Sequence, residues 1–368
     1  MERLTLSLAQ HRQQRQAALR WRSLRVAQVP TRDAFNRNDY LGLAQHPQVI
    51  AAFQQGLSDY GCGSAGSPLI CGYQAPHQRL TQQLAEWLER DSALLFSSGF
   101  AANQCALKGF HAYYDQLLLD RLCHASLLAG LPPRKWRRFP HQSVATARQW
   151  LGEGTNSIIT ESVFSMDGDQ APLAEFAALP ADLWVDDAHG IGVIGKGGRG
   201  AAALLPDSHA LLTIPFGKAI GVMGAALVGG TAELEYLVNE GREFIYSTAM
   251  PAAQAAAISA AITVIQSPEG EQIRQRLRER IARFRELCRA AGIALHPSEH
   301  PIQTIWLGAE QLALAWGQRL ADQQLDCGVI RPPTVPAGSA RLRITITANH
   351  TEAAIVRLVE GLKQCLTN

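Results

Sequence analysis

Two hydrophobic patterns alternate along the central part of the chain. Short apolar runs, typical of strands buried on both faces, are separated by stretches whose apolar residues recur with the period of a helix. The predicted strands cover residues 93–96, 116–120, 157–160, 183–186, 210–214 and 225–228. This alternation predicts an α/β fold in which helices cover both faces of a mainly parallel sheet.

The pattern changes at Ser267-Pro268, a pair that is typical of a helix start. We predict a long helix that ends around Gly292, a strand at 302–307, a helix at 310–324, an extended segment at 329–333, a strand at 341–347 and a last helix from Thr351. We therefore expect an N-terminal helix and arm (1–45), a large domain (46–266) and a small C-terminal α+β domain (267–368).

Side chains in the predicted strand 341–347 alternate between its two faces. Arg341 and Arg343 share one face with Thr345 and Thr347, and aliphatic residues occupy the other. We therefore expect Arg343 to face a cleft while its neighbours pack in the core.

The charge of the chain argues against a dedicated nucleic-acid-binding protein. The 368 residues include 34 Lys+Arg and 32 Asp+Glu, which gives a net charge of only +2. The basic run Arg134-Lys135-Trp136-Arg137-Arg138 is local. Such a run is more often a solvated surface than a docking site for a polyanion, and both interpretations stay open.

Composition also indicates where the protein works. The polar N-terminal segment does not resemble a signal peptide, and the most apolar stretch, 251–265, is too short to span a membrane. The seven cysteines are scattered without a Cys-x-x-Cys pair, which indicates reduced thiols and neither a disulfide framework nor a metal site. We expect a soluble, cytoplasmic protein.

Chemically distinctive residues follow the carboxyl ends of the predicted strands, where open α/β sheets bind ligands. Asp186 and His189 follow the strand 183–186, and Lys218 stands beside Gly217 after the strand 210–214. Pyridoxal phosphate (PLP) chemistry needs a lysine that forms an imine and a carboxylate that keeps the pyridine nitrogen protonated. The combination predicts a PLP enzyme.

Further residues at this edge fit the same chemistry. The turn Ser97-Ser98-Gly99 precedes a predicted helix, so its amides and the positive helix end suit a phosphate. His124 and Ser165 follow two other strands. Taken singly, each has an ordinary alternative: Lys218 also fits a surface lysine, and His124 and His189 fit hydrogen-bonded core histidines.

The stretch Gly190-Ile191-Gly192-Val193-Ile194-Gly195 matches the GxGxxG dinucleotide-binding fingerprint. In that fingerprint the first glycine directly follows a strand and the last glycine opens a helix. Here Asp187-Ala188-His189 intervenes before the glycines, and a second glycine-rich stretch follows them. We therefore predict that the chain does not bind a nicotinamide cofactor.

Over nearly its whole length the chain resembles the α-oxoamine synthases, PLP enzymes of fold-type I. The motifs that carry the resemblance occur in family order: Asn38-Asp39-Tyr40-Leu41-Gly42-Leu43, Gly63-Ser64-Ala65-Gly66-Ser67, Ser98-Gly99-Phe100-Ala101-Ala102-Asn103, His124 with Ser126, Val163-Phe164-Ser165-Met166-Asp167-Gly168-Asp169, Asp186 to Gly190, Phe216-Gly217-Lys218, Ile245-Tyr246-Ser247-Thr248, and Ile330-Arg331-Pro332-Pro333-Thr334-Val335-Pro336-Ala337-Gly338. The resemblance implies a large domain built on a mainly parallel seven-stranded sheet, with a smaller C-terminal α+β domain.

The resemblance also implies roles for the residues around the ring of PLP. Lys218 would bind the cofactor covalently, and Asp186 would pair with the pyridine nitrogen. His189 would hydrogen-bond the ring hydroxyl, and His124 would stack on the ring.

The phosphate and the substrate would be held by two further groups of residues. The phosphate ligands would be the amides of Gly99 and Phe100, with Ser165 nearby, and Ser247 or Thr248 from the partner subunit of a homodimer. The substrate site would be lined by Arg20, Asn38, Thr334 and Arg343, of which Arg343 would clamp the carboxylate of the amino acid.

Pro215 departs from the family, whose members usually carry Thr or Ser at this position to bind the phosphate. Proline supplies neither a hydroxyl nor an N–H group. Thr213 lies on the same strand face but ~6 to 7 Å further back. We therefore predict that the chain holds PLP more loosely than its relatives do.

The motif at 330–338 is similar to that of members that use L-alanine and a pimeloyl thioester. It implies a decarboxylative condensation of these two substrates, with coenzyme A or an acyl carrier protein as the acyl donor. The alternatives are a synthase that uses glycine and a PLP scaffold that has lost catalysis.

Overall fold

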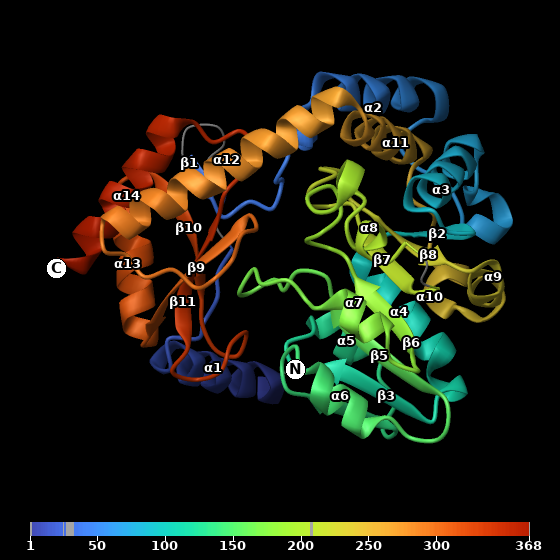
Figure 1. The fold of residues 1–368 in the computed structure, drawn as a ribbon, viewed down its shortest axis with the longest axis horizontal. Helices are drawn as coiled ribbons and strands as arrows, with labels where there is room; N and C mark the ends of the chain where they lie inside the picture. The colour runs from blue at the N-terminus through green and yellow to red at the C-terminus, as the bar shows by residue number, and fades with distance from the viewer. Residues whose placement is uncertain (1, 25, 27–32, 207–208, 368) are drawn as a thin grey trace. The chain divides into compact units, whose positions relative to one another are not determined.

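Two β-sheets organise the chain (Figure 1). The structure, a computed structural model, describes residues 2–24, 26, 33–206 and 209–367. It divides into unit 1 (Met1–Arg37, Met166–Gly168 and Arg278–Asn368) and unit 2 (Asn38–Ser165 and Asp169–Leu277). The expected N-terminal arm includes residues 25 and 27–32, which lie outside the described residues.

The sheet of unit 2 has seven strands in the order β2-β8-β7-β6-β5-β3-β4. Their bounds are β2 (Ser92–Phe96), β3 (Gln116–Asp120), β4 (Trp136–Phe139), β5 (Asn156–Glu161), β6 (Asp182–Asp186), β7 (Leu211–Pro215) and β8 (Ala225–Gly229). All pairings are parallel except those of β8, which runs antiparallel to both β2 and β7. The prediction of a seven-stranded, mainly parallel sheet is confirmed.

In this sheet, the strand that the sequence patterns missed is β4. Its first residues, Trp136, Arg137 and Arg138, are exposed, and only Phe139 is buried. It pairs with β3 alone, at the edge of the sheet. An exposed edge strand does not need the continuous apolar run that marks the buried strands β3, β5 and β8.

Helices of unit 2 surround this sheet (Figure 1). They are α2 (Pro47–Tyr60), α3 (Ala75–Leu88), α4 (Gly99–Phe110), α5 (Ala125–Ala129), α6 (Val144–Trp150), α7 (Leu173–Ala177), α8 (Ala201–Leu204), α9 (Thr231–Glu240), α10 (Arg242–Ile245) and α11 (Ala252–Gln266), with short helical turns at Leu43–Gln45, Pro68–Gly72, His111–Tyr113 and Lys196–Gly198. The helix predicted after Ser98 is confirmed as α4. It begins there because the Ser98 hydroxyl accepts the Ala101 N–H at 3.2 Å and caps the first turn.

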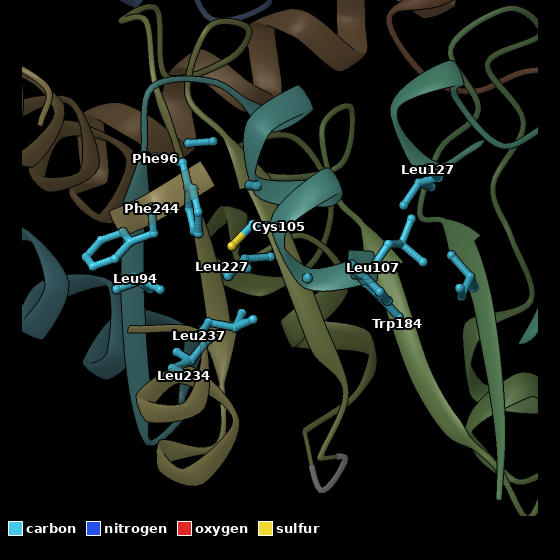
Figure 2. Packing of buried hydrophobic residues seen from close by; sticks show 14 of the residues in the cluster. Leu94, Phe96, Cys105, Leu107, Leu127, Trp184, Leu227, Leu234, Leu237 and Phe244 are labelled. Carbon is cyan, nitrogen blue, oxygen red and sulfur yellow. The ribbon is translucent and has the colours of Figure 1, made fainter. Parts of the chain in front are cut away.

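A hydrophobic core lies between α4 and the sheet (Figure 2). Cys105 and Leu107 of α4 pack in one buried cluster with Leu94 of β2, Leu227 of β8 and Trp184 of β6. Burial of apolar side chains contributes ~25 cal/mol per Å² removed from water. This packing fixes the start of α4 relative to the strand ends that carry the predicted site residues.

Unit 1 is built on a four-stranded sheet in the order β1-β10-β11-β9. Its strands are β1 (Asp33–Phe35), β9 (Ile302–Gly308), β10 (Leu325–Ile330) and β11 (Ala340–Thr345), and its helices are α1 (Glu2–Ala17), α13 (Glu310–Asp322) and α14 (Glu352–Leu366). The long helix α12 (Pro268–Ala290) begins at the predicted Pro268. The predicted C-terminal strands and helices are confirmed, except that the segment expected at 329–333 is the end of a strand that starts at Leu325.

Among the described residues, no helix is both long enough and apolar enough to cross a lipid bilayer.

Candidate active site

Parallel strands of unit 2 bring most of the predicted residues to one edge of the sheet. The two antiparallel pairings of β8 leave β2, β3, β5, β6 and β7 pointing the same way, so the segments that follow these strands start at the same edge. In the order of these strands, the segments carry Gly99 with Phe100, His124, Ser165, Asp186 with His189, and Lys218.

Asp186 is the last residue of β6 and is only 4% exposed. Its Oδ1 accepts the Ala188 N–H at 3.1 Å, and its Oδ2 accepts the Asn103 amide at 2.7 Å. A buried carboxylate is stable only when hydrogen-bond donors replace its lost water. These two donors suit an anionic carboxylate at the strand end.

Asn103 of α4, which is fully buried, connects Asp186 to the surrounding polar groups. Its Nδ2 donates to Asp186 and also to the Ser126 hydroxyl at 2.8 Å. Its Oδ1 accepts the Thr213 hydroxyl at 2.7 Å, and Thr213 in turn accepts the indole N–H of Trp184 at 3.2 Å. The orientation of the amide is therefore fixed at both ends.

His124 is the N-cap of α5, and its Nδ1 lies 2.8 Å from the Ser126 hydroxyl. The hydrogen-bond chain from Asp186 through Asn103 and Ser126 thus ends on this ring. Part of His124 is exposed, and desolvation of the rest lowers the pKa of its imidazole below 6.5. The negative charge of Asp186 opposes this shift and the positive charge of Lys218 supports it, so the ring is neutral at neutral pH.

Glu161, to which the sequence analysis gave no role, lies beside Asp186 in the register of β5 and β6. It is 2% exposed, and its Oε1 accepts the backbone N–H of His124 at 2.6 Å. Desolvation raises its pKa well above the ordinary value, and the charge of Asp186 adds to this effect. The available signal was an acid directly after the apolar run 157–160.

His189 is held by Tyr40, a second residue without a predicted role. The Tyr40 hydroxyl lies 2.5 Å from Nδ1 of His189 and 3.4 Å from Oδ1 of Asn38. Tyr40 is fully buried and His189 is 4% exposed. This contact orients the imidazole, and it places the predicted substrate residue Asn38 next to the His189 side of the site.

Lys218 lies in the turn that connects β7 to β8. Its carbonyl accepts the Gly221 N–H at 2.9 Å, and the Phe216 N–H donates to Gly224 at 2.8 Å, which closes the turn. Lys218 is half-buried, which differs from a surface lysine, and it stands at the sheet edge beside exposed Gly217. Its positive charge lowers the pKa values of both His124 and Glu161, so Lys218 lies within electrostatic range of these two residues.

The start of α4 forms a cradle in which Gly99 has no room for a side chain. A Cβ atom at Gly99 would lie 2.7 Å from Cγ of Pro215. The first N–H groups of a helix have no acceptor within it, and the helix dipole favours negative charge there. The amides of Gly99 and Phe100 therefore suit a phosphate, although Pro215 adds no donor.

Glycines 190–200 have a structural explanation. Asp187 is fully buried, and its Oδ2 accepts the Ala201 N–H at 2.8 Å. Its carboxylate leaves no space for a side chain at Gly190 or Gly200. Desolvation raises the pKa of Asp187 to about 7. Only the short helical turn Lys196–Gly198 follows Gly195 in this described segment, in place of the α-helix that a dinucleotide fingerprint requires.

The remaining residues predicted near the phosphate lie in two places in unit 2. Half-buried Ser165 stands in a tight turn in which the Phe164 N–H donates to Asp169 at 2.9 Å. Ser247 and Thr248 follow α10 and line a cavity of about 310 Å³, whose lining also includes Ser97.

Arg20, Thr334 and Arg343 belong to unit 1 and are described within it. Arg343 is 7% exposed, and its guanidinium donates to the Thr345 hydroxyl at 3.1 Å. Arg20 pairs with Glu310 at 3.0 Å, and Thr334 accepts a hydrogen bond from Arg22 at 2.8 Å.

The predicted alternation along β11 is confirmed by the neighbour of Arg343 on the same face. Arg341 forms a buried ion pair with Asp167 and lies 4.1 Å from the ring centre of Trp306. Of the two arginines, Arg341 is thus committed to an ion pair within unit 1.

Comparisons with known proteins agree with this geometry. The family model described as aminotransferase class I and II matches residues 34–362. The 8-amino-7-oxononanoate synthase of Sodalis glossinidius is 46% identical over 377 residues, which cover 98% of this chain and 97% of that protein.

Solved structures are also similar. The 8-amino-7-oxononanoate synthase of Francisella tularensis has a TM-score of 0.81 at 29% identity, covering 92% of this chain and 98% of that one. A serine palmitoyltransferase variant of S. paucimobilis, solved with PLP and myriocin bound, has a TM-score of 0.88 at 26% identity, covering 98% and 96%.

Proposed function

Because the chain belongs to the class I and II aminotransferase family, and within it to the 8-amino-7-oxononanoate synthases, we propose that it condenses L-alanine with a pimeloyl thioester. The products are 8-amino-7-oxononanoate, CO2 and the free thiol, and the reaction belongs to biotin biosynthesis. The observation that carries the proposal is the set of groups at one sheet edge: the hydrogen-bonded carboxylate of Asp186, the imidazole of His124, whose pKa is lowered, and Lys218 within electrostatic range of His124.

PLP is the cofactor, and it supplies an electron sink for the carbanion formed at the α-carbon of the amino acid. The residues present fit it. Lys218 offers the amine, Asp186 the carboxylate for the pyridine nitrogen, and the glycine cradle at the start of α4 the phosphate donors. His124, His189, Ser165 and Ser247 or Thr248 complete the ligands that we assign to it.

Asp186 would hold the pyridine nitrogen of the cofactor. The Ala188 and Asn103 donors fix the orientation of its carboxylate for this contact. Burial raises the pKa of neighbouring Glu161 well above its ordinary value, which disfavours a second negative charge beside Asp186.

Lys218 acts as the base. Its Nζ removes the α-proton of L-alanine and returns a proton later in the cycle. His124, whose pKa is lowered, would pack against the cofactor ring without adding a positive charge beside the Lys218 amine. Arg343 binds the carboxylate of the amino acid, for which the planar guanidinium is suited.

We also propose that the chain works as a homodimer in the cytoplasm. Ile70 (83% exposed), Met223 (68%) and Tyr246 (76%) are large apolar side chains of unit 2 that a partner subunit would cover. Tyr246 directly precedes Ser247 and Thr248, the residues expected to reach the site of the partner. All seven cysteines are free, which fits a reducing compartment.

The test is the reaction itself. The purified chain, loaded with PLP, is supplied with pimeloyl thioester and L-alanine carrying a labelled carboxyl group, and we expect labelled CO2 and 8-amino-7-oxononanoate by mass spectrometry. Glycine should replace L-alanine poorly. Faster turnover with glycine, or labelled CO2 without the condensation product, would overturn the proposal.

Two lysine variants provide the matched control. Lys218→Ala should abolish turnover, whereas Lys363→Ala, in the exposed last turn of α14, should leave it unchanged. Size-exclusion chromatography with light scattering tests the dimer, and a monomer that turns over at the full rate would exclude shared sites.

A further inference from the structure

Residues 121–150 carry a strong local charge asymmetry within unit 2. This stretch contains five arginines, one lysine and no Asp or Glu, a net charge of +6. Because the whole chain has a net charge of +2, all other residues together carry −4. The six cations, which we call the basic edge, are Arg121, Arg134, Lys135, Arg137, Arg138 and Arg148.

The basic edge is exposed and lacks ion pairs. All six residues are exposed, and within the part of the chain that the structure describes none of them forms an ion pair. The carboxylate of Asp115 is hydrogen-bonded to Thr155. These hydrogen bonds, and to a smaller extent the charge of Lys135, lower the pKa of Asp115. Other acids near this segment, Asp120 and Asp169, are paired with His141.

Several side chains of the basic edge are already ordered. The Arg137 guanidinium lies 3.8 Å from the ring centre of Trp150. Arg138 donates to the carbonyl of Arg121, and the Trp136 indole donates to Pro132 at 2.9 Å. Side chains that are held before a partner arrives lose less entropy on binding. Freely solvated cations would not have these contacts.

The basic edge adjoins the active site. Arg121 comes three residues before His124, on the segment that leaves the carboxyl end of β3. Because β4 is parallel to β3, with Phe139 opposite Asp120, Arg138 lies near the same end of the sheet. A partner bound there is therefore next to the segment that presents His124.

On the basis of the proposed function, we propose that the basic edge docks the acidic surface of a carrier protein that delivers the acyl thioester. Successive residues of a strand point to opposite faces, so Arg137 and Arg138 cannot both contact one nucleotide. A protein placed against the edge strand reaches both. Trp136 and Leu122, each 38% exposed, add the apolar contacts that protein interfaces have among arginines.

Charge reversal separates docking of a carrier protein from two alternatives, which are binding of a small polyanion and protection of the edge strand from pairing. The variant Arg134→Glu/Arg137→Glu is compared with Arg276→Glu/Arg289→Glu, which makes the same charge change at exposed positions of α12. Each is assayed with the pimeloyl group on an acidic acyl carrier protein, on coenzyme A and on pantetheine. We expect kcat/KM for the carrier-protein substrate to fall about tenfold in the first variant only, with the pantetheine substrate unchanged.

Two outcomes overturn the proposal. An equal loss with coenzyme A means that the cations bind a small polyanion. No loss with the carrier protein means that they only protect an edge strand from pairing with other chains. Calorimetry at low and high salt, which measures binding of the unacylated carrier protein to the parent and to both variants, tests the docking surface independently. Failure of the unaltered chain with pimeloyl-pantetheine counts instead against the proposed function.

Discussion

Two histidines that follow neighbouring strands of the same sheet differ in charge. His124 follows β3, and desolvation lowers the pKa of its imidazole, with help from Lys218. His141 follows β4, where desolvation also acts, but hydrogen bonds to Asp120 and Asp169 at 2.9 and 2.6 Å raise its pKa to about 10. One ring is neutral and the other is a cation.

The difference depends on which carboxylates remain available to the ring. Around His124, the Asp186 carboxylate is held by Asn103, and Glu161 accepts a backbone N–H while burial raises its pKa. Around His141, two acids face the ring directly. On the basis of the proposed function we call the part of the sheet edge around His124 the catalytic side, and the part around His141, where charges are paired, the structural side.

The largest expected effect is on the catalytic side. Asp186→Asn removes the negative charge that the pyridine nitrogen needs, and we expect kcat to fall by ~10² to 10⁴-fold with little change in stability. Asp169→Asn is the matched change on the structural side and should lower stability while keeping activity. Steady-state assays and thermal melts on both variants measure this, and an equal loss of kcat in both would abolish the distinction.

The second effect is on stability. His141→Asn leaves the buried Asp120 carboxylate without its cationic partner, and we expect the free energy of unfolding to fall by about 3 kcal/mol. Urea unfolding measures the change. His11→Asn, at an exposed position of α1, is the control, and a variant as stable as the parent would show that the ion pairs contribute nothing.

The same histidine predicts a pH dependence. Its pKa is about 10 in the folded chain and about 6.5 when unfolded, so its stabilising contribution is complete below pH 6.5 and is lost as the pH rises toward 10. Stability of the parent should therefore fall through this window more than that of His141→Asn. Parallel curves for the two proteins would contradict the assignment.

A smaller effect is expected from the side-chain amide of Asn103, which connects Asp186 to Ser126 and Thr213. Asn103→Ala removes one donor from Asp186 and the acceptor of Thr213, and we expect a roughly tenfold lower kcat and a loss of about 2 kcal/mol in stability. The pH titration of the absorbance of bound PLP should also shift, which a purely structural role would not cause. Asn239→Ala, on exposed α9, should change none of these.

The smallest effect concerns the phosphate cradle. Thr213 cannot replace the missing hydroxyl, because it already donates to Asn103. Pro215→Thr should therefore bind PLP up to about tenfold more tightly, the value of one added hydrogen bond. PLP remaining after dialysis measures this, with Pro140→Thr at an exposed position as the control. Equal retention by parent and Pro215→Thr would refute the prediction.

Most of the fold could be predicted because the central strands are buried and apolar. Their parallel order also places Asp186, Lys218 and His124 at one edge, so the main chemical groups followed from sequence position. The strand β4 was not predicted, because an exposed edge strand carries charged residues in place of apolar ones.

The supporting residues could not be predicted, because their partners are distant in sequence. Asn103 contacts Ser126, Asp186 and Thr213, which are 23, 83 and 110 residues away. An asparagine inside a predicted helix gives no local sign of such contacts. The role of Tyr40 likewise depends on its contact with His189, which is 149 positions away.

The reversed direction of β8 has a consequence for how the active amine moves. Because β7 and β8 are antiparallel neighbours, the loop between them is a closed hairpin, pinned at its base by Phe216 and Gly224 and within by Lys218 and Gly221. The backbone at Lys218 is clamped from both directions. Any displacement of the amine that keeps these backbone hydrogen bonds must therefore come from rotation about its own side-chain bonds.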